Sequence, residues 1–310
     1  MRGIRHAPIA LFAFNRPNHL RRTIESLKRC ESYEKSRIFL FVDGARTLSE
    51  VELVQATRSV AVELLGTHAE FRFSRENHGL SHSIINGVSE IVERYGRVIV
   101  IEDDLLLSRG FLRYVNEALS WYADDERIYQ VSGHNFNVPE LAWRRESMLL
   151  PLTTTWGWAT WSRAWRRFDP HAEAWKSYAL NKKVRHRFNL DGTYDYAAMM
   201  ERQMRGHVDS WGIRWYWTVF RAGGLSCFPP QSLVINAGMD GSGSHGPGKL
   251  RYFRQQEKFG RPPKFVPPRE SDVESIVWIK VKKAIWRQNG GNLGKAINIL
   301  KNICFWFMRD

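Results

Sequence analysis

The chain has few cysteines and no long apolar run. Its 310 residues include three cysteines, Cys30, Cys227 and Cys304, and their spacing fits neither a CxxC pair nor a metal-ligand motif. We therefore expect reduced, structural thiols, which favours the cytosol. No window approaches the roughly 18 to 20 consecutive apolar residues that a membrane-spanning helix needs. We expect a protein that is not integral to a membrane.

Acidic residues are also fewer than basic residues. The sequence holds 32 acidic residues against 46 lysines and arginines, a formal net charge of +14. Such a chain attracts anions, which include nucleic acid, an anionic lipid surface or a phosphate-bearing ligand. The basic residues are spread along the chain and no nucleic-acid-binding module is recognisable. A nucleic-acid-binding protein is therefore kept as an alternative, and the leading interpretation has no nucleic-acid partner.

The first half alternates between strand and helix patterns. Apolar runs predict strands at residues 9–14, 38–42, 71–73 and 98–101. Helical apolar spacing lies between them, as in Leu20, Ile24 and Leu27, across residues 51–65, and from Ile84 to Val92. This alternation predicts an α/β fold with a mostly parallel sheet covered by helices on both faces. Such sheets bind ligands at the carboxyl ends of their strands.

The pattern changes after about residue 125, where tryptophan, glycine and arginine become dense. Residues 236–248 are rich in glycine and predict a mobile loop. Residues 260–268 have the composition of a linker. Residues 276–308 mix apolar and basic side chains, which predicts one or two basic amphipathic helices broken at Gly290 and Gly291.

Three acids, Glu102, Asp103 and Asp104, follow the apolar run that ends at Ile101. Clustered carboxylates are hard ligands that suit Mg²⁺ or Mn²⁺, and such a metal often keeps substrate phosphates among its ligands. The alternative is a turn or a helix N-terminus capped by Ser108, where acids are also favoured. The triplet alone leaves both interpretations open.

Several stretches occur in an order seen in one enzyme group. They are "PIALFAFNRPNHLRRTIESL", "FVDG", "VIVIEDDLLLSRGFLRYVNEAL", "VSGHN", "WGWATWSRAW" and "DSW". Over roughly residues 8–245 the chain resembles nucleotide-sugar-dependent glycosyltransferases of the Rossmann-like GT-A fold, and most closely the N-acetylglucosaminyltransferase I branch and its bacterial family-2-like relatives. The resemblance implies a nucleotide-sugar-binding half at 1–125 and an acceptor-side half with the catalytic base at 126–259. Composition adds a linker with a basic helical tail at 260–310.

The resemblance also implies roles at the donor site. Asp104 would ligate Mn²⁺ or Mg²⁺ bridging the donor diphosphate, and Glu102 and Asp103 would face the donor sugar and ribose. Asp43 would accept a hydrogen bond from the base, unless it only forms an Asp-Gly turn. Arg16 would help to hold the nucleotide, or is a surface arginine.

Two further segments are assigned to the donor by the same resemblance. Asn77 and Gly79 belong to a turn expected to lie against the nucleotide, where glycine permits close backbone approach. His245 would reach the metal or the diphosphate, or else is an exposed loop histidine. His78 and His82 have the spacing of a zinc pair, but no further ligand accompanies them, so we predict no zinc site.

On the acceptor side, Asp209 aligns with the catalytic aspartate, which removes the proton from the attacking hydroxyl. Its competitors are Asp195 and Glu201. One base and no protein nucleophile imply inversion at the anomeric carbon. Aromatic rings could form a sugar platform, although such clusters are more often core; the candidates are Trp156, Trp158 and Trp211.

The sequence thus predicts a metal-dependent, inverting glycosyltransferase that moves a hexosyl or N-acetylhexosaminyl group from a nucleotide-diphosphate sugar to a glycan or lipid-linked glycan. From the resemblance we expect a role in bacterial surface polysaccharide biosynthesis. A catalytically inactive sugar-binding relative is an alternative, and a nucleotidyltransferase is disfavoured because "NRPNHL" replaces a glycine-rich loop after the first strand. We expect a cytoplasmic protein whose basic tail either lies peripherally on the inner face of the membrane or packs on the domain.

Overall fold

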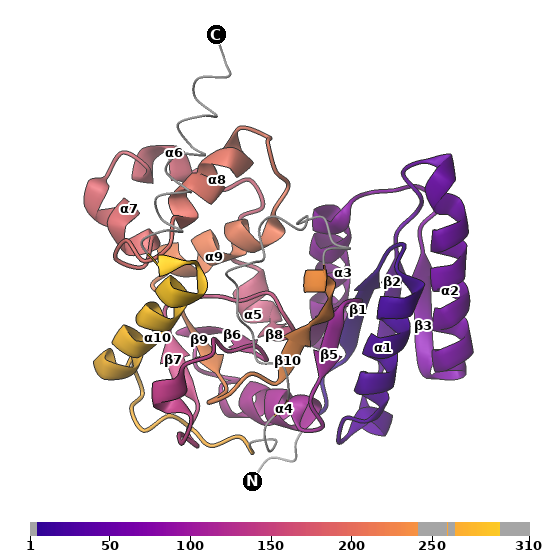
Figure 1. The fold of residues 1–310 in the computed structure, drawn as a ribbon, viewed down its shortest axis with the longest axis horizontal. Coiled ribbons are helices and arrows are strands. Elements are labelled where there is room, and N and C mark those ends of the chain that lie inside the picture. Colours follow the sequence, from indigo (N-terminus) through magenta and orange to yellow (C-terminus); the bar gives the residue numbers. More distant parts are fainter. Residues whose placement is uncertain (1–4, 241–258, 260–263, 292–310) are drawn as a thin grey trace.

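An eight-stranded sheet runs through the molecule in the computed structural model, which describes residues 5–240, 259 and 264–291 (Figure 1). Its strand order is β3-β2-β1-β4-β8-β6-β9-β7. The first four strands in the chain are parallel: β1 (Ile9–Ala13), β2 (Ile38–Val42), β3 (Ala69–Phe73) and β4 (Arg97–Glu102). The predicted parallel α/β sheet is therefore confirmed in this half.

The second half of the chain extends the same sheet. Its strands are β6 (Ile128–Ser132), β7 (Met148–Leu150), β8 (Trp158–Trp161) and β9 (Leu225–Phe228). Strand β8 lies antiparallel between β4 and β6, β9 is parallel to β6, and β7 is antiparallel to β9. Strands from before and after residue 125 thus belong to one continuous sheet. The division of the chain into a donor-binding half and an acceptor-side half stays a prediction about function.

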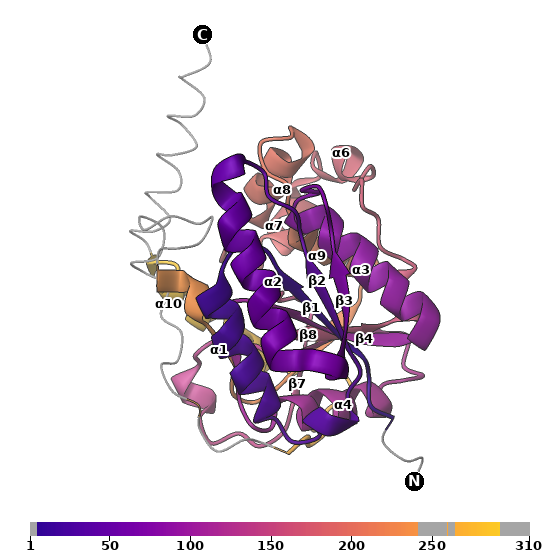
Figure 2. The same ribbon diagram turned by 90° about the vertical axis from the view of Figure 1, so that its right-hand side faces the viewer.

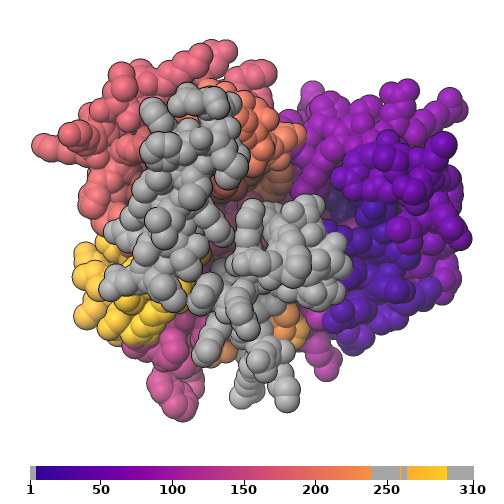
Figure 3. Space-filling model, turned by 45° about the horizontal axis from the view of Figure 1, so that its top comes forward, coloured from indigo at the N-terminus to yellow at the C-terminus, as the bar shows by residue number. Residues whose placement is uncertain are grey.

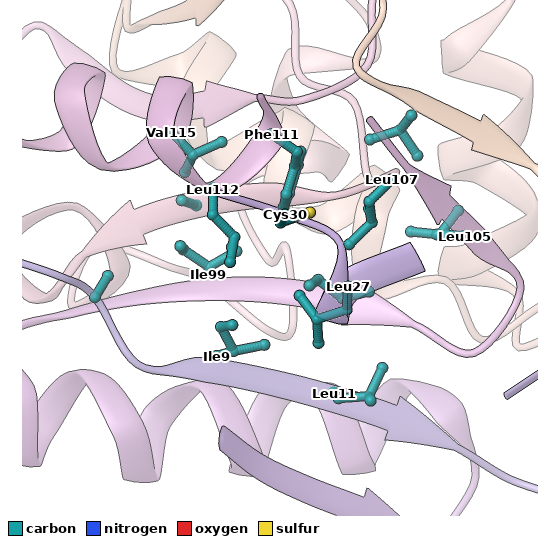
Figure 4. Packing of buried hydrophobic residues seen from close by; sticks show 14 of the residues in the cluster. Ile9, Leu11, Leu27, Cys30, Ile99, Leu105, Leu107, Phe111, Leu112 and Val115 are labelled. Atoms are coloured by element: carbon teal, nitrogen blue, oxygen red, sulfur yellow. The ribbon is translucent and has the colours of Figure 1, made fainter. Parts of the chain in front are cut away.

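Both faces of β1, β2 and β4 are largely buried, which is why their sequences are mostly apolar. Successive residues point to opposite faces. Ile9 and Leu11 of β1 pack with α1 (Pro17–Lys28), α2 (Val51–Leu65) and α4 (Phe111–Trp121), as Figure 4 shows in part. Ala10 and Phe12 pack with α3 (Leu80–Tyr95), α5 (Ser162–Trp165) and α9 (Trp211–Arg221). Figure 2 shows α1 and α2 on one side of these strands and α3 on the other.

A separate aromatic core lies under the later helices. It is formed by α6 (Trp175–Tyr178), α7 (Lys182–Phe188), α8 (Tyr196–Met204), the other face of α9, and α10 (Ser275–Gln288). Phe188 stacks on Tyr216 with ring centroids 4.7 Å apart, and Trp217 packs edge-on against Trp175. In the space-filling view of Figure 3 these later residues lie beside the indigo and purple first third of the chain.

The acid triplet is not at a helix N-terminus. Strand β4 ends at Glu102, and β5 (Leu105–Leu107) follows and pairs antiparallel with β10 (Val234–Asn236). Helix α4 begins only at Phe111, with Gly110 before it and no side-chain cap. The alternative in which Ser108 caps this helix is therefore wrong. Short 3₁₀ helices lie at Tyr33–Lys35, Leu48–Glu50, Gly66–His68, Pro139–Leu141 and Ala237–Asp240.

Two predictions about the C-terminal region need correction. The described part of the supposed linker packs on the domain, because the Phe265 amide donates to Glu117 at 3.1 Å and the Val266 carbonyl accepts from Ser147 at 2.8 Å. Of the predicted glycine-rich loop at 236–248, residues 236–240 form the end of β10 and a 3₁₀ helix, and residues 241–248 lie outside the described residues. Helix α10 confirms one amphipathic helix in the tail, and the second would fall outside the described residues.

The described helices include none that is long and apolar enough to cross a membrane. Cys30 and Cys227 are buried free thiols, as expected, and burial raises the pKa of each to about 12. Cys304 lies outside the described residues.

Candidate active site

The ends of three neighbouring strands bring the predicted donor residues to one edge of the sheet. Arg16 follows β1, Asp43 follows β2, and Glu102 ends β4. The strands are held in register there, since Phe12 lies opposite Glu102 and the Asp43 amide donates to the Ala13 carbonyl at 3.2 Å. Topology alone therefore gathers charged groups that are far apart in the sequence.

Asp104 is bound by a cationic side chain and approached by the 3₁₀ helix that follows β10. Its carboxylate accepts from the Arg16 guanidinium at 3.1 Å, and both side chains keep about a fifth of their surface exposed, 22% for Arg16 and 18% for Asp104. The Ala237 amide donates to the Asp104 carbonyl at 2.7 Å. A Cβ at Gly238 would come within 2.2 Å of an Asp104 carboxylate oxygen, so this close approach requires glycine. Sequence reasoning missed Gly238.

The other two acids of the triplet are more enclosed. The Asp103 carboxylate accepts from the Phe14 amide at 3.2 Å, and its carbonyl accepts from the Thr23 hydroxyl at 2.6 Å. Burial raises the pKa of Glu102 to about 8 and that of Asp103 to about 7, and the charge of Asp104 adds to both shifts. The triplet is therefore an electrostatically unfavourable group of carboxylates that a cation would stabilise.

Asp43 holds the turn that precedes α3. Its carboxylate accepts from the amides of Gly44 at 2.9 Å, His78 at 3.0 Å and Gly79 at 2.8 Å. Asn77 donates to the Gly44 carbonyl at 2.7 Å and ties the same two segments together. Asp43 and Asn77 thus position the turn, and the hydrogen bond that Asp43 would accept from a nucleotide base stays a prediction.

Gly79 leaves open space at the start of α3. Its φ of +82° is one that glycine adopts without strain, and no atom lies within 4 Å of where its Cβ would be. The backbone at Gly79 is thus open to solvent, and the predicted close approach of the nucleotide stays a prediction.

Asp209 is placed beside this turn by an arginine that the sequence did not point to. Arg214 of α9 donates to the Asp209 carboxylate at 2.7 Å, to the Ser81 hydroxyl in the first turn of α3, and to the Pro170 carbonyl at 2.9 Å. The Asp209 side chain is 64% exposed, whereas that of Arg214 is 12% exposed. Arg214 therefore joins the candidate base to the helix that Gly79 precedes.

The competing acids have structural partners. Asp195 caps α8 by accepting from the Ala198 amide at 3.1 Å, and it also accepts from Asn189 at 2.9 Å. Glu201 accepts from Arg185. Neither contact links these acids to the sheet edge, and the choice of Asp209 as the base stays a prediction.

Two residues of the predicted sugar platform are core residues. Trp158 has no exposed surface and Trp211 is 5% exposed, and their rings stack with centroids 5.2 Å apart. That prediction is wrong for both, because a ring packed in the core presents no face to a sugar. Trp156 is half-buried and stays a prediction; its ring lies edge-on against His134, with centroids 4.6 Å apart.

His134 was not singled out as a site residue, although it lies in the "VSGHN" stretch. It is buried, its Nδ1 is 3.2 Å from the Ser232 hydroxyl, and burial lowers its pKa to about 3. Its imidazole is therefore neutral at physiological pH.

The depressed pKa predicts a pH dependence of folding. In the unfolded chain His134 binds a proton below about pH 6.5, whereas in the folded protein it binds one only below about pH 3. The free energy of unfolding therefore decreases as the pH falls below about 6.5. Between pH 7 and 4.5 this group should cost about 2–3 kcal/mol. Urea unfolding at both pH values should show a smaller loss for His134→Gln than for wild type. The exposed His82→Gln should retain the wild-type difference, and an unchanged difference in His134→Gln would refute the assignment.

The described residues contain no group of three or more His, Cys, Asp or Glu side chains placed to hold a metal. His245 lies outside the described residues, and its predicted role stays a prediction. The oxygen ligand offered by Asp104 nevertheless fits Mn²⁺ or Mg²⁺, because Mg²⁺ in particular often binds through one or two carboxylates, with substrate phosphates and water completing its shell. The raised pKa values of Glu102 and Asp103 support this fit.

Comparison with protein families identifies a match for this chain. The model of glycosyl transferase family 2 matches residues 9–197, which is more than half of the chain. The match includes every described donor-site residue and stops before Asp209 and Trp211. No curated protein matches the chain significantly in sequence.

Solved structures show weaker similarities. A mannosyltransferase from Pyrobaculum calidifontis in complex with GDP-Man and Mn²⁺ is 12% identical, with 71% of this chain and 74% of that chain covered and a TM-score of 0.37. The galactosyltransferase LgtC, in complex with donor and acceptor sugar analogues, is 12% identical, with coverages of 55% and 65% and a TM-score of 0.33. These values support no particular donor, metal or linkage for this chain.

The sheet with its acidic carboxyl edge, together with the family match, makes this protein a glycosyltransferase. The chain belongs to glycosyl transferase family 2. The family-2 part of the predicted relationship is thus confirmed, whereas the N-acetylglucosaminyltransferase I branch stays an expectation.

Proposed function

We propose that the chain is a metal-dependent, inverting glycosyltransferase that uses a nucleotide-diphosphate sugar and a glycan or lipid-linked glycan acceptor. Its proposed setting is bacterial surface polysaccharide biosynthesis. The observation that carries the mechanism is the convergence of Arg16, Asp43 and the acid triplet on one sheet edge, with the Gly79 turn beside them.

The donor nucleotide would lie across this edge. The open backbone at Gly79 admits close approach of the nucleotide, and Arg16 supplies a cation for the diphosphate. Mn²⁺ or Mg²⁺ held by Asp104 would stabilise negative charge developing on the leaving diphosphate. Arg16 would then exchange its contact with Asp104 for one with a phosphate oxygen.

The acceptor hydroxyl would be deprotonated by Asp209. This carboxylate is exposed enough to meet an acceptor, and Arg214 fixes it beside α3. A base on one face and a leaving group on the other allow direct displacement, which inverts the anomeric carbon. Burial of Trp158 and Trp211 leaves Trp156 as the platform candidate.

A screen of nucleotide-diphosphate sugars tests the proposal. Wild-type protein with Mn²⁺ or Mg²⁺ should release nucleoside diphosphate slowly from one donor by hydrolysis, and faster once an acceptor glycan is added. The anomeric configuration of the product, read by NMR, should be inverted. Binding of a donor without any turnover would favour the inactive sugar-binding alternative, and a retained configuration would refute the single-base mechanism.

A further inference from the structure

Helix α10 has one face in the core and another in solvent. Val277, Val281 and Ala284 are buried in the aromatic core of the second half. On the opposite side, Ile276 is 66% exposed and Ile279 60% exposed. Figure 1 shows α10, in yellow, at the outer edge of the molecule. The exposed isoleucines are therefore not explained by packing of the helix.

Basic residues share this outer face, which we define by helical spacing as residues 276, 279, 280, 283, 286 and 287. Lys280, Lys283 and Arg287 alternate along it with the isoleucines and with Trp286, which is 37% exposed. Helix α10 contains no acidic residue.

The positive charge of this face is only partly compensated. Glu140 is paired with Arg287 at 2.8 Å, and the charge of Lys283 also acts on its carboxylate. Among the carboxylates in the described parts of the chain, none forms an ion pair with Lys280 or Lys283. The face therefore combines exposed apolar side chains with two lysines whose charge is available to a partner.

A neighbouring segment adds another exposed ring. Residues 137–144 are tied to α10 because Gln288 donates to the Asn137 carbonyl at 3.3 Å and Arg144 donates to Glu274 at 3.0 Å. This segment carries Trp143, which is 95% exposed. Tryptophan is enriched at membrane–water interfaces because its ring is amphipathic.

We propose that the outer face of α10 docks on an anionic lipid bilayer surface. A helix lying in the interface buries its apolar side chains at the headgroup boundary while its lysines meet anionic headgroups. A nucleic acid or an acidic protein surface would use the lysines but gain little from Ile276 and Ile279, so the bilayer is the partner that explains both. This inference goes beyond glycosyl transfer and does not depend on it.

Vesicle flotation of the full chain tests the proposal. Wild-type protein should bind vesicles of phosphatidylcholine with about 30% phosphatidylglycerol and not vesicles of phosphatidylcholine alone, because anionic headgroups attract the lysines. Lys280→Glu/Lys283→Glu should lower the partition coefficient about 30-fold or more, since each basic residue near the surface contributes about a factor of five. Ile276→Ser/Ile279→Ser should also lower it, with the charge intact.

Matched variants on the far side of the molecule serve as controls. Leu53→Ser/Val62→Ser on α2 and Lys28→Glu/Arg29→Glu at the end of α1 change other exposed apolar and basic residues and should bind as wild type does. Thermal melting establishes that each variant is folded. Absence of wild-type binding, or binding that Ile276→Ser/Ile279→Ser leaves unchanged, would overturn the proposal. So would an oligonucleotide that binds this face more tightly than the vesicles do.

Discussion

Replacing Asp209 with asparagine should reduce glycosyl transfer by about 10²- to 10⁴-fold, the usual contribution of a general base, while leaving donor affinity unchanged. Asparagine keeps the size of the side chain and can still accept a hydrogen bond from Arg214. It cannot take a proton from the acceptor hydroxyl. Steady-state rates and equilibrium donor binding, measured on the same preparation, separate these two effects.

The matched control is Asp195→Asn. Asparagine caps a helix about as well as aspartate, so this variant should keep both the fold of α8 and full activity. Loss of transfer in Asp195→Asn with retention in Asp209→Asn would move the base to the other acid. The control matters because the family match ends at residue 197, before the proposed base.

Replacing Asp104 with asparagine should weaken Mn²⁺-dependent donor binding about 100-fold, or ~2.7 kcal/mol. This loss is comparable to the free energy of one hydrogen bond to a charged group, about 1.5–3 kcal/mol. The amide keeps the shape of the side chain beside Gly238 but removes the charge that a divalent cation requires. Calorimetric titration of the donor at fixed Mn²⁺ measures the change.

Asp125→Asn is the control for general loss of negative charge. Asp125 is paired with Arg127 at 2.7 Å on the surface just before the start of β6, and its replacement should not alter donor binding. If Asp104→Asn binds donor and Mn²⁺ as tightly as wild type, the metal site lies elsewhere.

Much of the donor half could be predicted from local sequence. The apolar runs at β1, β2 and β4 are continuous because both faces of these strands are buried, and this also fixes where the strands end. Because the carboxyl ends of parallel strands meet at one edge of the sheet, the sequence alone predicts that Asp43 and Asp104 lie at the same edge. The predicted range of α2 agrees with the structure residue for residue.

The acceptor half was less predictable because its contacts join distant segments. Nothing local indicates that β8 inserts antiparallel between β4 and β6, and this insertion is what buries Trp158. Gly238 meets Asp104 only because β10 pairs with β5. The link from Asp209 to Ser81 through Arg214 likewise depends on how α9 packs against α3.

The central claim is that a nucleotide-diphosphate sugar binds at this sheet edge with a divalent cation. The most direct measurement is calorimetric titration of the donor found in the screen into wild-type protein, first with Mn²⁺ and then with excess EDTA. We predict that EDTA weakens binding at least about ten-fold, or ~1.4 kcal/mol. Equal affinity with and without EDTA, or no binding of any nucleotide sugar, would contradict the account.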